Sequence, residues 1–195
     1  MSFIRNLLAL VGVIAIASGI FFYGKIAPEI AAFKQLDPGA KDVYLTMWEK
    51  LKETGNSADA SIWKFPLEKG VSWEDAEEAM ASVANEHNIK NVGELPLSEQ
   101  VKIMTGEEQR FLKIYQYCDP LIAKQMVDFS DAFAAFLPCR ISMVEDKDGK
   151  FWLYALNMDM MIEGGRTLPD PLLSQASKVR EVILDIMKKG AAGDF

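Results

Sequence analysis

The chain begins with an uninterrupted apolar run, and shorter periodic patterns follow it. Residues 7–23 read LLALVGVIAIASGIFFY without a charge, between Arg5 and Lys25. At about 1.5 Å per residue the run spans about 25 Å, enough for a thin hydrocarbon core if the flanking cations reach the interfaces. We therefore predict a retained transmembrane anchor over residues 1–25, in preference to a secretory signal cleaved after Ala15-Ile16-Ala17.

Small residues line one face of this predicted anchor helix. Gly12, Ala15 and Gly19 would allow close packing against another membrane helix, although such residues are also simply common in membrane helices. The lysines after the span favour a cytoplasmic body, whereas the short cationic tail and signal-like run favour export. We expect a single-pass protein of a bacterial inner membrane, with its globular domain in the periplasm.

The periodicity of the remaining chain predicts an α+β protein. A membrane-proximal helical segment, residues 26–56, is followed by a globular domain, residues 57–195, with a polar linker at residues 55–59. The predicted strands are 62–67, 111–117, 140–145 and 151–155, with a further short strand near 92–97, and the main helices are 73–86, one starting at 120, and one from 172. We expect a small antiparallel or mixed sheet with helices packed on it, preceded by the N-terminal transmembrane helix.

The last helix has the clearest pattern. Asp170 is the expected cap, Pro171 takes the first turn, and Gly190 is the expected end. Its predicted core face comprises Leu172, Ala176, Val179, Ile183 and Ile186.

Composition and charge narrow the function classes. Half of the 195 residues are hydrophobic and a quarter are charged, which excludes a disordered chain. The residues after position 25 carry 19 cationic and 28 anionic side chains, so they repel phosphate backbones and we expect no nucleic-acid partner. The expected partners are membrane lipid, other membrane-protein subunits or a second copy of the chain, and a basic soluble protein.

Two cysteines are the main candidates for chemistry, and each lies beside a proline at a strand end, in YQYCDP and FLPCRI. Cys118 and Cys139 can be buried small side chains, a disulfide or reactive thiols. The helix start after Cys118 and the charge of Arg140 would favour thiolates, while Asp119 opposes this. Because a strand–helix–strand crossover is common, we predict parallel strands here, with free, largely buried thiols at opposite ends of the sheet and both side chains on the apolar face.

These segments resemble the family called domain of unknown function 302, over about residues 111–161. Its members show a cysteine-Asn-Pro corner after one strand and a leucine-Pro-cysteine-Arg entry to another, followed by an acidic hairpin similar to VEDKDGKFW here. This chain departs at Asp119, where asparagine is usual. The resemblance implies a small α+β domain, often dimeric, with no established activity.

Other sites have weaker support. Met158, Met160 and Met161 are soft ligands that could join the thiols around Cu(I), although core packing explains them more simply. The single histidine, His87, lacks the spacing of a zinc site, and no catalytic motif is present. We therefore expect no cofactor and no catalytic residue.

Two functions follow from these patterns. The first is a membrane-anchored, non-catalytic interaction or accessory subunit of an inner-membrane complex, whose acidic domain docks a partner. The alternative is a redox, sulfur-handling or soft-metal-binding module that uses Cys118 and Cys139.

Overall fold

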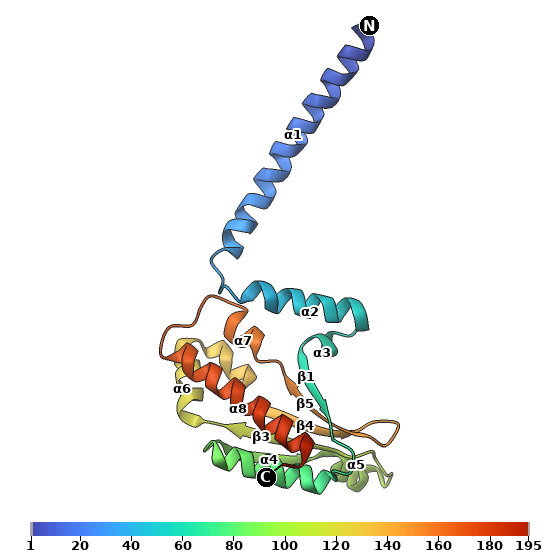
Figure 1. The fold of residues 1–195 in the computed structure, drawn as a ribbon, viewed down its shortest axis with the longest axis vertical. Helices are drawn as coiled ribbons and strands as arrows, with labels where there is room; N and C mark the ends of the chain where they lie inside the picture. The colour runs from blue at the N-terminus through green and yellow to red at the C-terminus, as the bar shows by residue number, and fades with distance from the viewer. Residues whose placement is uncertain (1, 195) are drawn as a thin grey trace.

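The computed structural model describes residues 2–194 as a long N-terminal helix followed by an α+β domain (Figure 1). The sheet has the strand order β1-β5-β4-β3-β2, and each of these neighbouring pairs is antiparallel. The elements are α1 (Ser2–Phe33), α2 (Ala40–Thr54), α3 (Ser57–Ala60), β1 (Ile62–Pro66), α4 (Trp73–Glu86), β2 (Lys90–Pro96), α5 (Leu97–Thr105), β3 (Leu112–Cys118), α6 (Pro120–Phe129), the 3-10 helix η1 (Asp131–Phe136), β4 (Cys139–Glu145), β5 (Phe151–Leu156), α7 (Asp159–Glu163) and α8 (Leu172–Ala192).

The first helix, α1, stands apart from the domain (Figure 1). It has 32 residues, and none of them is buried. Its most apolar 18-residue window has a mean hydropathy of 2.3. The prediction of an N-terminal helix long and apolar enough to cross a membrane is therefore confirmed.

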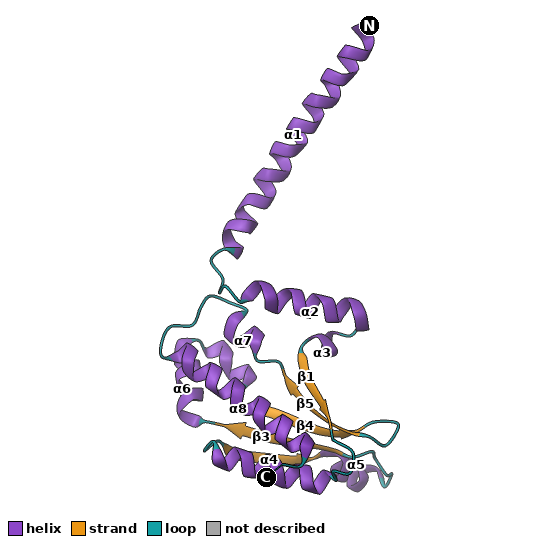
Figure 2. Cartoon of the chain, viewed as in Figure 1, coloured by secondary structure: helices purple, strands orange, loops and turns teal. Residues whose placement is uncertain are grey.

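One face of the sheet forms the core of the domain. Helices α4 and α8 pack on each other and cover this face (Figure 2). The predicted apolar face of α8 is confirmed, because its five residues are buried or half-buried against the core. The buried sheet side chains on this face are Tyr115, Tyr117, Ile141, Met143, Leu153 and Ala155. The opposite face, which includes Ile114, Ser142 and Tyr154, is half-buried.

The helix α4 begins with a capping box, whereas the ends of α8 differ from expectation. The Ser72 hydroxyl accepts a hydrogen bond from the Asp75 N–H, and the Asp75 carboxylate accepts one from the Ser72 N–H. In α8, Asp170 does not cap the helix, and the capping position falls on Pro171 without a side-chain bond.

The helix α8 also continues through the glycine that was expected to end it. Gly190 lies inside α8 because its missing side chain leaves room for α4: a Cβ there would meet Met80 Cγ at 2.4 Å. The helix ends instead at Gly193, whose φ of 69° is the left-handed conformation that glycine adopts without strain.

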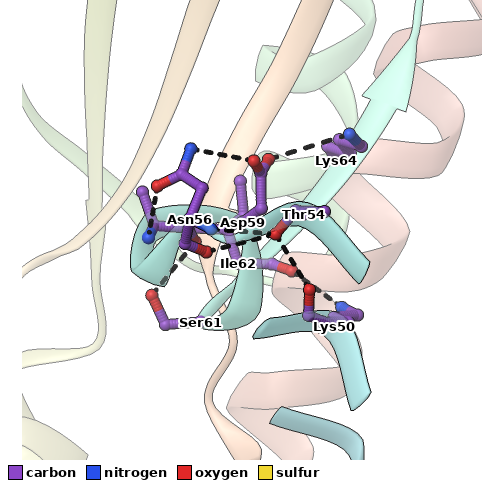
Figure 3. A network of polar contacts seen from close by, with 8 residues as sticks. Lys50, Thr54, Asn56, Asp59, Ser61, Ile62 and Lys64 are labelled. Carbon is purple, nitrogen blue, oxygen red and sulfur yellow. Dashed lines mark hydrogen bonds and ion pairs between the residues drawn. The ribbon is translucent and has the colours of Figure 1, made fainter. Parts of the chain in front are cut away.

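A network of polar contacts joins α2 to the edge strand β1 (Figure 3). The Asn56 amide donates to the Asp59 carboxylate at 2.8 Å, and Lys64 forms an ion pair with Asp59 at 3.8 Å. Lys50 donates to the Ile62 carbonyl at 3.3 Å. The segment expected to be a polar linker therefore contains the capped helix α3, which fixes the end of α2 to the sheet.

The beginning of α2 is also attached to the domain. The Tyr44 hydroxyl donates to the Gly164 carbonyl at 2.7 Å, just after α7. The Asp37 N–H donates to the Gly165 carbonyl at 2.8 Å. Because Ala40 and Val43 are buried as well, the first turn of α2 packs on the domain.

Candidate functional site

The two cysteines lie at the same end of the sheet. Because β3 and β4 are antiparallel, Tyr117 pairs with Cys139, and Cys118 follows Tyr117 directly. The predicted parallel crossover is therefore wrong. The helix α6 lies at the end of the sheet and does not cross a face, and η1 brings the chain back after Ser130 (Figure 1). Both thiols are free.

The cysteines belong to opposite faces of the sheet. Cys139 has the parity of the buried Met143 and packs against the core, as predicted. Cys118 has the parity of the half-buried Ile114, so its predicted position on the apolar face is wrong. The buried positions of β3 are taken by tyrosines such as Tyr117, whose rings fill the space under the covering helices.

A small apolar cavity nevertheless brings the cysteines together with three methionines. Cys118, Cys139, Met126, Met158 and Met161 all border a space of about 30 Å³ between the sheet end, α6 and α8. The other side chains along this cavity are apolar, apart from Tyr117 and Asp119. A space of this size holds an ion or a water molecule and excludes an organic substrate.

A second, larger cavity adjoins the first. It has a volume of about 260 Å³ and shares Cys139, Met158 and Met161 with the small one. Ser142 and Tyr154 border it as well, so it opens toward the uncovered face of the sheet. Cys139, Met158 and Met161 therefore border both the small apolar cavity and the larger space that leads toward the uncovered face of the sheet.

The third candidate methionine lies elsewhere. Met160 is 45% exposed and borders a different hollow beside Met47. His87 does not border the sulfur cavity either. Its Nε2 lies 2.8 Å from the Asp185 carboxylate on α8. Among residues 2–194, no three His, Cys, Asp or Glu side chains group as a metal site.

Burial keeps both thiols protonated near neutral pH. It raises the pKa of Cys139 to about 11, with a smaller contribution from the Cys118 thiol. Burial also raises the pKa of Cys118, and the Asp119 carboxylate adds to the effect. The expectation that Arg140 favours a thiolate is not met, because Arg140 is exposed on the strand face opposite Cys139.

The helix start beside Cys118 is confirmed, but it is already occupied. Asp119 Oδ1 accepts hydrogen bonds from the N–H groups of Leu121 and Ile122, at 2.9 and 3.1 Å. The negative cap offsets the positive end of α6, so the helix does not lower the pKa of the thiol. The arrangement provides soft sulfur ligands and weak nucleophiles.

Several side chains of the cavity wall were not among the predicted site residues. Ile122 and Met126 of α6 and Val179 of α8 line the small cavity from the helix side. Their only sequence signal is the apolar periodicity of the two helices, which is also the signal of an ordinary core.

A family model described as "Domain of unknown function DUF302" matches residues 63–190. The chain belongs to the DUF302 family. The matched segment runs from β1 into α8 and includes both cysteines, so it extends the resemblance well beyond residues 111–161. The helices α1 and α2 lie before it.

A solved DUF302 structure shows the same fold. The crystal structure of an uncharacterised conserved DUF302 protein from Bacillus stearothermophilus superposes with a TM-score of 0.54 at 12% sequence identity. The alignment covers 66% of this chain and 96% of that one. At this identity the likeness concerns the fold alone. No curated protein matches the chain.

Proposed function

We propose that this DUF302 protein is a membrane-anchored domain that binds one Cu(I) ion through Cys118, Cys139, Met158 and Met161. The supporting observation is that these four sulfur residues, from three segments of the chain, border one apolar cavity of about 30 Å³ together with Met126 of α6. Thiolates and thioethers are soft ligands that suit Cu(I). Zinc also binds thiolates, but its sites are completed by further cysteines, histidine or carboxylates and not by thioethers.

The surroundings of the cavity favour a soft monovalent ion. Asp119 is the one acidic side chain on its border, and two backbone N–H groups already occupy Oδ1 of its carboxylate. The methionines add sulfur without charge. Each thiol that coordinates Cu(I) would release its proton, so one thiolate balances the ion and a second leaves a single negative charge. Sequence alone predicts no cofactor, and the grouping of the four sulfur residues is our reason for departing from that expectation.

Competition for Cu(I) tests this function. The full chain in detergent, with both thiols reduced, is titrated against a chromophoric Cu(I) chelator under anaerobic conditions. We expect one Cu(I) per chain. Replacing either cysteine by serine should weaken the affinity by at least about tenfold, equivalent to about 1.4 kcal/mol.

The methionines supply a matched comparison. Met161→Leu removes a sulfur from the cavity, whereas Met160→Leu makes the same chemical change outside it. We expect only Met161→Leu to weaken Cu(I) binding. A folded, reduced wild-type chain that takes no Cu(I) from the chelator would contradict the proposal, as would equal losses in the two variants.

An accessory role in an inner-membrane complex is a second candidate. Gly12, Ala15 and Gly19 support it, because none of them is buried in α1 and their face is free to pack against other membrane helices. The acidic domain would dock a basic soluble partner, and the half-buried sheet face offers room for another subunit or a second copy. Extraction in mild detergent tests this role: we expect a constant set of co-purifying subunits, and a chain that purifies alone would contradict it.

We place the domain on the periplasmic side of a bacterial inner membrane as part of the same proposal. The signal-like form of residues 7–23 supports export. A C-terminal reporter that is active only in the cytoplasm would contradict this orientation, and a mature chain that starts at Ser18 would contradict a retained anchor.

A further inference from the structure

The outward face of α2 combines apolar and cationic side chains in a narrow stripe. Lys41, Leu45, Trp48 and Lys52 are all exposed, and Trp48 is 56% exposed. At about 100° per residue these four positions fall within an arc of about 60°. The opposite side of the helix packs on the domain through Ala40 and Val43. We call these four residues the α2 stripe.

The acidic residues of α2 lie beside the stripe. Asp42, Glu49 and Glu53 are exposed, but the helical period places them together on the next arc of the helix surface. Two lysines thus flank Leu45 and Trp48 in a domain whose overall charge is negative. Tryptophan, leucine and lysine are residue types that helices on a lipid surface use, and the acidic side chains lie off this stripe.

The length of α1 brings α2 to such a surface. Its 32 residues measure about 48 Å along the helix axis, and a typical tilt of about 20° reduces this to about 45 Å across a membrane. A bilayer is about 40–45 Å thick with its headgroups. If the apolar part of α1 crosses the membrane, Phe33 therefore lies close to the outer limit of the headgroups, and α2 begins seven residues later.

The domain presents the stripe toward that side. In Figure 1, α2 lies at the end of the domain nearest α1, between α1 and the sheet. Its position is fixed at one end by the Tyr44 hydroxyl bond to Gly164 and at the other by the Lys50 bond to Ile62. A helix held in this way by its inward face leaves its outward face free for the membrane.

We infer that the α2 stripe rests on the lipid surface, with Trp48 and Leu45 at the boundary between headgroups and acyl chains and with Lys41 and Lys52 on anionic headgroups. Tryptophan prefers this boundary, and lysines close to an anionic surface are attracted to it. The inference rests on the membrane anchor of the proposed function, but it is independent of the sulfur site.

Quenching of tryptophan fluorescence by brominated lipid tests the contact. The full chain is reconstituted, at few copies per vesicle, into phosphatidylcholine with a quarter of phosphatidylglycerol, with or without bromine on the upper acyl carbons. The difference between wild type and Trp48→Phe isolates the emission of Trp48. We expect bromine to remove at least half of that emission and to leave the Trp48→Phe protein, with Trp63, Trp73 and Trp152, nearly unchanged.

The lysines are tested in the same vesicles. We expect the double variant Lys41→Gln/Lys52→Gln to lose most of the Trp48 quenching, because it lacks the two charges that bind anionic headgroups. Carbonate extraction reports insertion of α1 separately. If carbonate does not extract the protein but bromine quenches wild type and Trp48→Phe equally, the inference is wrong and the anchor stands. The same holds if protection of Trp48 from quenching increases with the number of copies per vesicle, because a second copy then covers Trp48 in place of lipid. Protein that carbonate extracts overturns the anchor, and the inference with it.

Discussion

Replacement of Gly190 by alanine should change the free energy of unfolding in opposite directions through helix propensity and through close helix packing. Propensity alone predicts that alanine inside α8 stabilises the protein by about 1 kcal/mol. The structure predicts the opposite. The new Cβ would lie 2.4 Å from Met80 Cγ and 3.4 Å from Leu153 Cδ1, and both side chains are fully buried. Overpacking of this kind costs about 1–3 kcal/mol.

The balance of the two effects is a net destabilisation of about 1 kcal/mol. Unfolding of the full chain in detergent, followed by near-UV circular dichroism, measures it as a fall in melting temperature of about 3 °C. Gly165→Ala is the control, because a Cβ at Gly165 meets nothing within 4 Å. A Gly190→Ala variant that is about 1 kcal/mol more stable than wild type would refute the packing argument.

A double-mutant cycle identifies the neighbour responsible. Met80→Ala removes the atom that the new Cβ would meet, and costs about 2–5 kcal/mol by itself. In that background Gly190→Ala should no longer destabilise. The expected coupling between the two sites is therefore about 1–3 kcal/mol, well above the error of additivity for independent sites.

Three further predictions concern the same domain. Ile183→Asp should abolish the near-UV circular dichroism signal, because Ile183 is 1% exposed in the core and a charge cannot be buried there. The control Ser174→Asp, on the exposed side of α8, should still fold. The folded state raises the pKa of Cys139 from about 9 to about 11, so it holds the proton more tightly than the unfolded state. The Cys139 thiol should therefore lower the free energy of unfolding by up to about 1.4 kcal/mol per pH unit between pH 9 and 11. Denaturant titrations should show a shallower decrease for Cys139→Ala. Ser72→Ala removes the α4 cap and should cost about 1 kcal/mol in the same titration, and an unchanged midpoint would contradict the cap.

Local patterns predicted most of the elements, because they depend on neighbouring residues alone. The alternation in 111–117 and the acidic turn before Phe151 each define a strand or a hairpin without reference to the rest of the chain. The end of α8 was placed wrongly for the opposite reason. A glycine near the end of a helix fits both a terminus and a close helix contact, and only the position of Met80 distinguishes the two.

The direction of the strands was beyond local reasoning. The chain between Cys118 and Cys139 is long enough for either a crossover or a return. The ten residues of α6 rise about 15 Å, whereas the seven residues of β3 extend about 23 Å, so α6 is too short to span the sheet alone. The extended residue Ser130 then separates α6 from η1 and lets the chain return. The grouping of the sulfur residues depends on this return, so sequence alone could supply the candidate residues but not the site.

The short helix α7 connects the sulfur cavity with α2. Arg180 of α8 donates to Asp159 at 3.0 Å and to Glu163 at 2.6 Å, and so holds both ends of α7. Met161 lies between these two contacts, and the next carbonyl after α7 accepts the Tyr44 hydroxyl of α2. One sulfur ligand of the proposed site is therefore fixed on a segment held between the core helix and the helix nearest the anchor. Because rigid support of ligands strengthens a metal site, we expect docking of α2 to affect Cu(I) affinity through α7, although no residue of α2 borders the sulfur cavity.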